Sequence, residues 1–373
     1  MKTIYFFAKV GCISKKAFGG GEIGNRKTIN MLKELGYNVQ LIPRYYNYNQ
    51  KNPLVYAQII FGDLFSVMKL FFSLLFRKRT ESCVHIVGFT GKYLFIELLS
   101  IFTAKLLRYT VVYEIRGGGI IDFYKNGSFL YKKMLQSAIH KSDCIFTQGK
   151  ENHDLLKKLS YKNFLYYPNY IEPSFAPKSL PEKSISPIKL IYIGRLAPVK
   201  GVDLVLKIFK ILKDSQLNVQ LDIIGEATDF PDYEKELLNF VKTNNLSDYS
   251  HFHGNITHTE MIPLLQNALF FIFPSTEPRE GQSNSLTEAM SYGVIPIASP
   301  QGYTRSIIEN NLLIVDNLNP HDYAARISHI LSNNLQKDLS KQVFDRVRNN
   351  FSYDIIKENV RCCYAEIFGE NNG

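Results

Sequence analysis

Two glutamates, Glu280 and Glu288, are separated by seven residues in a polar, glycine-containing stretch. The apolar segments on either side, 269–273 and 294–298, are typical of buried strands, and a helix is expected to begin near Ser283. In a parallel α/β sheet, the turn from a strand into a helix exposes backbone N–H groups to a ligand. Because carboxylates hydrogen-bond vicinal hydroxyls, the pair suits a sugar or a ribose. The alternative is one helix cap and one exposed helical charge.

A second group of candidate residues follows the segment 189–193, which we expect to be a strand. Arg195 and Lys200 come after it and directly before an expected helix. Arginine offers a planar fork of donors and lysine a point charge, so together with a helix N-terminus they suit a diphosphate. The alternative is an ordinary solvated loop that carries two cations.

A run of three glycines, Gly19-Gly20-Gly21, is expected to end the loop after the first strand. Gly20 and Gly21 would let the backbone approach an anionic ligand. The run lacks the G-x-G-x-x-G spacing of a dinucleotide fold, so a flexible turn is the alternative.

The elements that must position these residues alternate between strand and helix in two series. A proline-rich segment over 169–187 separates the series and is typical of an interdomain linker. The pattern predicts two doubly wound, mostly parallel α/β domains over 1–172 and 173–351. Strands are expected over 3–9, 39–42, 84–87, 110–115, 144–147, 164–167, 189–193, 220–224, 251–254, 269–273, 294–298 and 312–315. Helices are expected over 22–35, 54–76, 93–107, 129–141, 151–159, 202–213, 233–244, 258–266 and within 320–368.

Composition narrows the class of protein. The chain has 373 residues, which favours two domains, and 21% charged residues, which argues against long disorder. Its five cysteines show no metal-ligand spacing, so we expect no metal site, and their scatter suits a reducing cytoplasm. The first residues lead directly into a strand, so no signal peptide is expected.

Charge is distributed unevenly along the chain. Residues 1–172 hold 25 Lys and Arg against 11 Asp and Glu, whereas residues 173–373 hold 19 against 23. This asymmetry predicts an anionic partner for the first half: nucleic acid, an anionic membrane surface or a phosphate-bearing substrate. A solvated basic surface without a dedicated partner is the alternative.

The most apolar segment is 54–76, which Asp63 and Lys69 interrupt. A membrane-spanning helix needs about 20 nearly uncharged residues, so we do not expect a span. A helix buried against the first sheet is one interpretation. The other is a helix that rests on an anionic membrane, with the following Arg77-Lys78-Arg79 at the lipid headgroups.

Four segments resemble the retaining family-4 glycosyltransferases of GT-B architecture. Gly194 to Gly201 resembles their G-R-L-x-x-x-K-G motif, and Glu280 to Ala298 resembles their E-x7-E-A-M-x-x-G-x-P-I-A signature. Tyr167-Pro168-Asn169 resembles the P-N before the linker, and Phe351-Ser352-Tyr353 resembles the F-S-W at the start of the last helix.

This resemblance implies a sugar transfer from a nucleotide-sugar donor with retention of anomeric configuration. Arg195 and Lys200 would hold the donor diphosphate, Glu288 the ribose, and Glu280 the transferred sugar. The further donor contacts would be Gly194, Gly225, Gly281, Gln282, Ser283 and Asn284. No metal and no cofactor are implied. The fold would be two Rossmann-like domains that face a cleft, with a last helix, about 352–373, that crosses back to the first domain.

The resemblance also implies that the first half binds the acceptor, a glycan or a lipid-diphosphate-linked glycan. This suits bacterial surface polysaccharide biosynthesis (capsule, O-antigen or lipopolysaccharide) in the cytoplasm, at the inner face of the membrane. Lys125, Lys132 and Lys133 would join the basic run of residues 77–79 at that surface.

The chain departs from the family pattern at two places. Arg116 stands where many members have a histidine, and would face the diphosphate or a charged acceptor; a salt bridge with Glu114 or Asp122 is the alternative. The common G-F-G after the first glutamate is replaced by Gly281-Gln282-Ser283. Because both positions are expected to lie near the donor sugar, the family pattern does not predict which sugar is transferred.

Two other functions are compatible with parts of the sequence. A sugar-nucleotide epimerase on a GT-B-like scaffold would use the same donor motifs with an acid and a base at the sugar. A nucleic-acid binder would use the basic half, but the sequence contains no recognisable nucleic-acid module, so no nucleic acid is expected as a partner.

Overall fold

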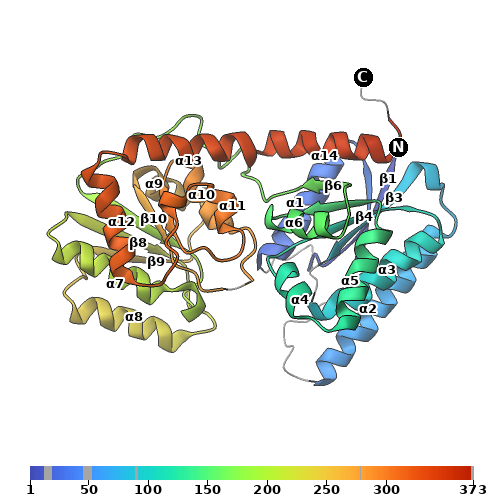
Figure 1. The fold of residues 1–373 in the computed structure, drawn as a ribbon, viewed down its shortest axis with the longest axis horizontal. Coiled ribbons are helices and arrows are strands. Elements are labelled where there is room, and N and C mark those ends of the chain that lie inside the picture. Colours follow the sequence, from blue (N-terminus) through green and yellow to red (C-terminus); the bar gives the residue numbers. More distant parts are fainter. Residues whose placement is uncertain (12–18, 45–52, 89–90, 278, 371–373) are drawn as a thin grey trace. The chain divides into compact units, whose positions relative to one another are not determined.

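The chain forms two compact units in a computed structural model that describes residues 1–11, 19–44, 53–88, 91–277 and 279–370 (Figure 1). The first unit comprises Met1–Asn169 together with the chain from Ile356 onward, and the second comprises Tyr170–Ile355. The sequence predicted boundaries at residues 172 and 352. The observed boundaries lie three to four residues from these, one in the linker and one in the first turn of the last helix.

The first unit is built on a six-stranded parallel sheet with the strand order β2-β1-β3-β4-β5-β6. Its strands are β1 (Thr3–Ala8), β2 (Asn38–Pro43), β3 (Ser82–Gly88), β4 (Thr110–Ile115), β5 (Cys144–Thr147) and β6 (Phe164–Tyr166). The order reverses between β1 and β3, and in such sheets the ligand crevice opens at the carboxyl ends of the strands at this point.

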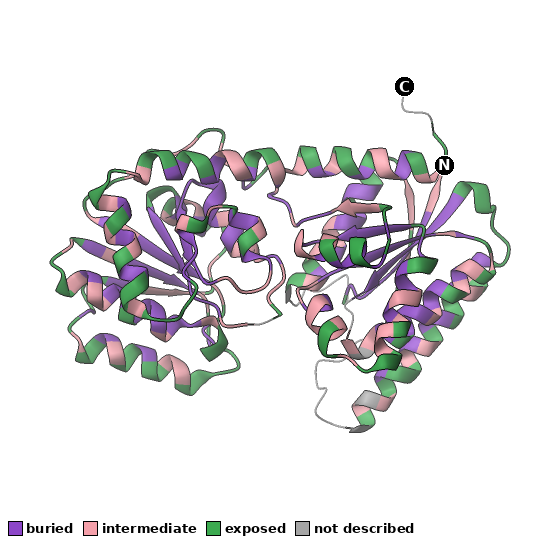
Figure 2. Cartoon of the chain, in the orientation of Figure 1, coloured by how far each residue is buried: buried purple, intermediate pink, exposed green. Residues whose placement is uncertain are grey.

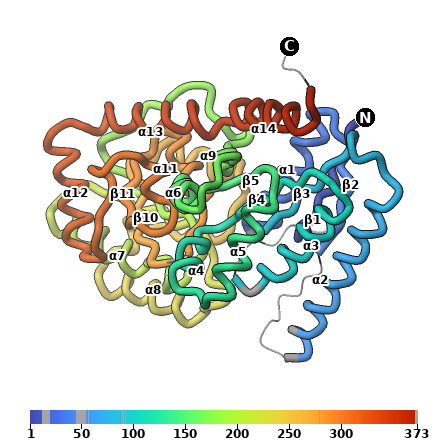
Figure 3. The backbone as a smooth tube through the Cα atoms, turned by 45° about the vertical axis from the view of Figure 1, so that its right-hand side comes forward, coloured from blue at the N-terminus to red at the C-terminus, as the bar shows by residue number. Residues whose placement is uncertain are grey.

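Helices cover both faces of this sheet because right-handed crossovers in opposite directions place them on opposite sides. The connection from β1 to β2 is α1 (Gly19–Glu34), and the later connections run the other way through α2 (Pro53–Leu74), α3 (Leu94–Leu106) and α5 (Phe129–Lys141). Helices α2, α3 and α5 lie side by side in one layer, as Figures 1 and 3 both show. Two shorter helices, α4 (Ile120–Asn126) and α6 (Glu151–Lys158), complete the unit.

The last helix, α14 (Tyr353–Ile367), returns to the first unit, as the resemblance implied. The Tyr364 hydroxyl lies 2.5 Å from Nδ1 of His85 on β3, and Lys357 pairs with Glu34 of α1 at 2.8 Å. Side chains of a strand alternate between faces, so His85 points toward α14 while its neighbours Val84 and Ile86 enter the core on the other side.

The second unit has a five-stranded parallel sheet with the order β11-β10-β7-β8-β9. Its strands are β7 (Ile188–Ile193), β8 (Val219–Ile224), β9 (Ser250–Gly254), β10 (Phe270–Phe273) and β11 (Ile295–Ala298). Its helices are α7 (Val202–Asp214), α8 (Pro231–Thr243), α9 (His258–Asn267), α10 (Asn284–Ser291), α11 (Thr304–Ile308), α12 (Pro320–Ser332) and α13 (Gln336–Asn350). The strand order reverses between β7 and β10. Figure 2 shows both sheets buried between partly exposed helices.

Two expected elements differ in the structure. The segment 312–315 was predicted as a strand, but it begins in a 3-10 turn (Asn311–Leu313), and only Ile314 bridges to Ala298. Leu313, Ile314 and Val315 are buried, so their apolar character reflects packing at the sheet edge and not a ladder. The three glycines 19–21 were predicted to lie in a loop, but they form the first turn of α1.

A buried ion cluster fastens α2 and α3 to the first sheet. Arg44 follows β2, and its guanidinium lies 3.0 Å from the Asp63 carboxylate on α2 and 3.6 Å from that of Glu97 on α3. The Tyr113 hydroxyl of β4 donates to Glu97 at 2.7 Å. Burial lowers the pKa of Arg44, but the carboxylates of Glu97 and Asp63 outweigh it, so the pKa is raised. The cluster sets which face of α2 points inward.

Asp63→Ala should lower the free energy of unfolding by about 3–5 kcal/mol, because it leaves a buried guanidinium with half of its compensating charge. The matched control is Asp232→Ala, which removes an exposed partner of Lys235 and should cost less than about 1 kcal/mol. Urea denaturation of both variants provides the comparison. Equal losses would contradict the role of the buried pair.

Candidate active site

Four loops meet at the carboxyl edge of the second sheet. They are 194–201 after β7, 225–230 after β8, 274–283 after β10 and 299–303 after β11. Because the strand order reverses between β7 and β10, the first and third of these loops flank the position at which doubly wound sheets bind ligands. All the predicted donor-site residues except Asn284 and Glu288, which lie on α10, are in the first three loops.

The side chains of Lys200 and Glu280 are in direct contact across this point. The Lys200 ammonium donates to Oε2 of Glu280, and the Ser275 hydroxyl donates to the same oxygen at 2.9 Å. The side chains of Lys200 and Glu280 are 15% and 13% exposed, so both groups are largely withdrawn from solvent. The pair presents an ammonium suited to a phosphate oxygen beside a carboxylate suited to hydroxyl groups.

Close backbone contacts hold these loops together at two glycines. A Cβ on Gly225, whose φ is +140°, would lie 1.8 Å from the carbonyl oxygen of Gly194. A Cβ on Gly302, whose φ is +58°, would lie 1.9 Å from the carbonyl oxygen of Glu280. No other residue type fits at these positions without moving the backbone that carries the site.

Two helices, α7 and α10, begin at this edge of the sheet. The N-cap residues of α7 and α10 are Gly201 and Ser283, and neither provides a side-chain hydrogen bond to its helix. By contrast, Thr257 caps α9 through a capping box with Glu260. One first-turn donor of α7, the Asp203 N–H, is bonded to the Tyr233 hydroxyl at 3.0 Å. The positive ends of the two helix dipoles nevertheless accompany Lys200, an arrangement that favours an anion.

Two other predicted residues have different partners. The Arg195 guanidinium is 64% exposed and lies 3.7 Å from the Asp229 carboxylate, which is also exposed. Glu288 is half-buried on α10, and its carboxylate lies 3.5 Å from Nε2 of His258 at the start of α9. The imidazole of His258 in turn packs on the ring of Phe175, at 4.8 Å between centroids.

The polar side chains at the start of α10 differ in how far they are buried. Gln282 is buried, whereas Ser283 and Asn284 are half-buried. The hydroxyls of Ser283 and Ser285 lie 3.0 Å apart. Gln282 is thus enclosed by the loop, and Ser283 and Asn284 stay accessible at the helix start.

Three residues at this edge were not predicted from the sequence: Ser275, Asp229 and His258. Ser275 carries a usable signal, because it is a hydroxyl residue two positions after the end of β10 and five before Glu280. The other two meet Arg195 and Glu288 through tertiary contacts between different loops, and no spacing in the chain indicates them.

In the first unit, the predicted residue Arg116 follows β4 and is turned inward. Its Nε lies 2.5 Å from Oε1 of Glu114, and one terminal nitrogen donates to the Thr28 hydroxyl of α1 at 2.8 Å. The guanidinium lies against Gly24, where a Cβ would be 1.8 Å from it. The salt bridge to Glu114, considered above as the alternative, is therefore present.

Glu114 connects Arg116 to the last helix. Its second oxygen lies 2.8 Å from Nε2 of His85, whose other ring nitrogen meets Tyr364. Burial raises the pKa of Glu114, but Arg116 and His85 outweigh it and lower the pKa below its usual value. Arg116 and Glu114 thus join β4 to α1 and to the last helix.

The two predicted glycines of the first unit lie in the first turn of α1. Gly20 is exposed and Gly21 is half-buried.

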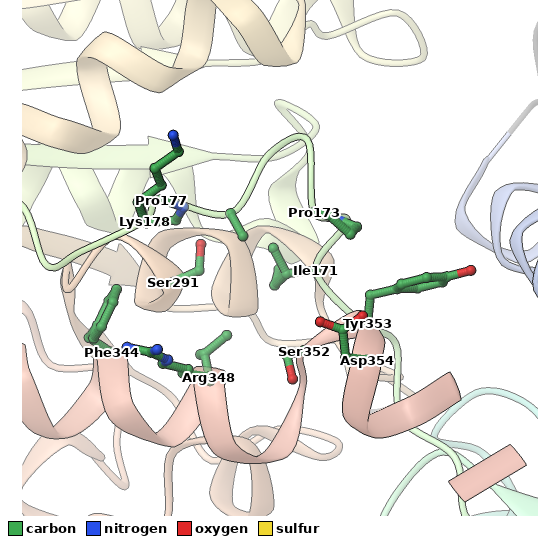
Figure 4. Close-up of a pocket in the computed structure, with 12 residues that line it drawn as sticks. Ile171, Pro173, Pro177, Lys178, Ser291, Phe344, Arg348, Ser352, Tyr353 and Asp354 are labelled. Atoms are coloured by element: carbon green, nitrogen blue, oxygen red, sulfur yellow. The ribbon is translucent and has the colours of Figure 1, made fainter. Parts of the chain in front are cut away.

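The second unit also contains a cavity of about 250 Å³ between the linker and the helices α13 and α14 (Figure 4). Ile171 and Pro173 of the linker form one wall, and Phe344 and Arg348 of α13 form another. None of the predicted site residues lines it. Within the described residues, no group of three or more His, Cys, Asp or Glu is arranged to hold a metal ion.

The second unit, which carries the candidate site, is similar to known glycosyl transferases. Residues 178–346, most of the second unit, match the family Glycosyl transferases group 1. Over 202 residues the chain is 29% identical to an uncharacterized glycosyltransferase, MJ1069, of Methanocaldococcus jannaschii, which covers 53% of this chain and 49% of that relative. The chain thus spans about half the length of this relative. It is 23% identical to the capsular polysaccharide biosynthesis glycosyltransferase CapM of Staphylococcus aureus, over 84% of each chain.

A solved structure, that of Anabaena Alr3699/HepE in complex with UDP, has a TM-score of 0.68 at 12% identity over 98% of this chain and 100% of that one. The two parallel-sheet, Rossmann-like domains are those of the GT-B fold, as predicted. The fold and the family match together support a GT-B glycosyltransferase.

Gly225→Ala should destabilise the chain more than Gly254→Ala. Both positions have positive φ at the ends of neighbouring strands, but only Gly225 meets backbone, whereas a Cβ on Gly254 would have nothing within 4 Å. We expect a loss of about 1 kcal/mol at Gly254 from backbone strain alone. At Gly225, displacement of Gly194 should add about 1–3 kcal/mol, measurable by urea denaturation. Equal losses would contradict the close approach of these two loops.

Proposed function

We propose that this chain is a retaining glycosyltransferase that moves a sugar from a nucleotide-sugar donor to a glycan or lipid-diphosphate-linked glycan. The observation that carries the proposal is the Lys200–Glu280 pair at the strand-order reversal of the second sheet, beside the N-termini of α7 and α10. A nucleoside diphosphate joined to a sugar has an anionic part and a hydroxyl-rich part, and this site offers a partner for each.

The donor diphosphate would lie at the N-termini of α7 and α10, within reach of Lys200. The exposed Arg195 has a weak partner in Asp229, so little is lost when its guanidinium moves to a phosphate. As the bond from the sugar to the diphosphate breaks, negative charge grows on the leaving oxygen. Cations and N–H groups already oriented there stabilise this charge more than they stabilise the ground state.

The two glutamates would hold the hydroxyl groups of the donor. Glu288, beside His258, would bind the ribose, and Glu280, neutralised by Lys200 and oriented by Ser275, would bind the transferred sugar. Backbone N–H groups of Gly281 to Ser283 would add donors next to Glu280. The transition state would have oxocarbenium character, and we assign no protein nucleophile.

Positive charge at this site comes from side chains and helix ends, so we propose that transfer needs no divalent metal and no cofactor. We place the acceptor on the first unit, which carries the excess of basic residues. The similarity to a capsular polysaccharide enzyme supports a role in bacterial surface polysaccharide biosynthesis, in the cytoplasm at the membrane.

A thermal-shift screen against UDP-, GDP-, ADP- and dTDP-sugars identifies the donor. A ligand at 100 times its dissociation constant should add about 2.7 kcal/mol to the stability of the folded state, which raises the melting temperature by several degrees. Stabilisation by none of these nucleotides would contradict the proposed donor site. Isomerisation of a stabilising sugar nucleotide without acceptor would instead identify an epimerase.

Glu288→Ala and Arg195→Ala should each lower the rate of sugar transfer by about 10²–10³-fold or more, because each removes a contact to the donor. Glu236→Ala, which removes an exposed carboxylate on α8, is the matched control and should keep full activity. Circular dichroism should show all three folded. Transfer should persist in EDTA, and proton NMR of the product should show the anomeric configuration of the donor. Full activity of both site variants would overturn the proposal.

A further inference from the structure

The outward face of α2 is apolar over most of its length. One side of the helix enters the core of the first unit through Ile59, Val67, Leu70 and Leu74. The other side exposes aromatic rings, with Phe61 71%, Phe65 53% and Phe72 64% exposed. An exposed row of this size on a folded domain indicates a surface that contacts another apolar phase.

Two neighbouring helices extend this surface. In the layer that α2 shares with α3 and α5, α3 exposes Phe95, Phe102 and Leu106, and α5 exposes Phe129 and Leu130. Figure 2 shows the exposed positions along these helices. We call the exposed side chains of α2, α3 and α5 the apolar helix face.

The charges on the apolar helix face have one sign. The three helices contain two carboxylates, Asp63 and Glu97, and both are buried in the ion cluster with Arg44. Several lysines lie over the exposed rings: Lys69 over Phe65 at 4.8 Å, Lys141 over Phe102 at 4.9 Å and Lys133 over Phe129 at 5.6 Å. Arg77-Lys78-Arg79 follows the end of α2.

Two exposed carboxylates adjoin these helices, Glu81 beside Lys78 and Asp143 beside Lys105 of α3. The helices themselves expose no carboxylate, and apolar rings flanked by lysine ammonium groups complement an anionic lipid surface. The rings enter the boundary between headgroups and acyl chains, and the long lysine side chains reach the lipid phosphates. A second copy of the chain fits this face less well, because a symmetric interface would bring the same cations together.

Helix α2 is long and apolar enough to cross a bilayer by the measure of length and composition, over Ala57–Leu74. The contacts of its inner face indicate that it does not span the bilayer. Crossing would leave Asp63 without a partner and Arg44 with Glu97 alone, and it would remove four apolar side chains from the core. A helix with one face in the core and one face in the lipid interface keeps both sets of contacts.

We propose that the apolar helix face binds the surface of an anionic bilayer, with α2 parallel to the membrane plane and Phe61, Phe65 and Phe72 inserted among the lipids. This inference goes beyond the transfer reaction, because it concerns a surface that takes no part in donor binding. It rests on the proposed location at the membrane, but its test needs neither donor nor acceptor, so it can fail while the proposed transfer reaction stands.

The experiment uses the full chain and vesicles of phosphatidylcholine, with or without about one third phosphatidylglycerol to supply the negative surface potential that attracts basic residues. We expect cosedimentation with the anionic vesicles, at least about tenfold stronger than with the neutral ones, and weaker in 0.5 M salt, where charges are screened within about 4 Å. Phe61→Ser/Phe65→Ser/Phe72→Ser should reduce binding at least about tenfold (about 1.4 kcal/mol). The matched control is Leu238→Ser/Leu318→Ser, two exposed leucines of the second unit, which should bind as the wild type.

The chain contains no tryptophan, so one introduced residue reports its own surroundings. Phe65→Trp should shift its fluorescence to the blue when anionic vesicles are added, whereas Phe230→Trp on the second unit should not. Absence of binding to anionic vesicles, or equal binding by the triple-serine variant, would overturn the proposal. A dimer in light scattering that the triple-serine variant dissociates would assign the face to self-association instead.

Discussion

Reversal of strand order in the second sheet is the constraint on which the candidate site depends. The connections that follow β7 and β10 run in opposite directions, so the loops after these strands lie at the position where doubly wound sheets bind ligands. Lys200 and Glu280 form an ion pair between these two loops, and the helices α7 and α10 start there without a side-chain hydrogen bond from their own N-cap residues. A close approach between Gly201 and the Pro274 carbonyl oxygen holds these two loops together, and one between Gly225 and Gly194 adds the loop after β8. The fold thus holds the Lys200 ammonium, the Glu280 carboxylate and the N-termini of α7 and α10 at one edge of the sheet.

Buried charges have a different task in the first unit. Arg44, Asp63 and Glu97 neutralise one another and determine which sides of α2 and α3 face the sheet. Arg116, Glu114 and His85 form a second network that links α1, β4 and the last helix. Since an unpaired charge in such surroundings would cost several kcal/mol, each network specifies a single arrangement of its helices. The outward faces of α2, α3 and α5 are consequences of the first network.

The two units therefore differ in which polar groups they expose and which they bury. In the second unit, ammonium, carboxylate and N–H groups gather at the open edge of the sheet, which suits a small polar ligand. In the first, the carboxylates of the outer helices are withdrawn and the exposed surface is apolar and cationic. This division of chemistry is compatible with an enzyme that takes a water-soluble donor on one domain and meets its acceptor at a lipid surface with the other.

Alternation of apolar segments with amphipathic ones was sufficient to predict two parallel α/β domains, because strand and helix periodicities are local properties. The spacing around Arg195, Lys200, Glu280 and Glu288 likewise predicted that they follow strands β7 and β10, where the structure has them. Tertiary structure alone decided that Lys200 pairs with Glu280, that Arg116 turns inward to Glu114, and that residues 312–315 pack without forming a strand. It also decided that α2 is both a core helix and an exposed surface, since a helix without periodic polarity does not reveal which side the sheet covers. These outcomes depend on contacts between residues far apart in the chain, whose energies no local pattern records.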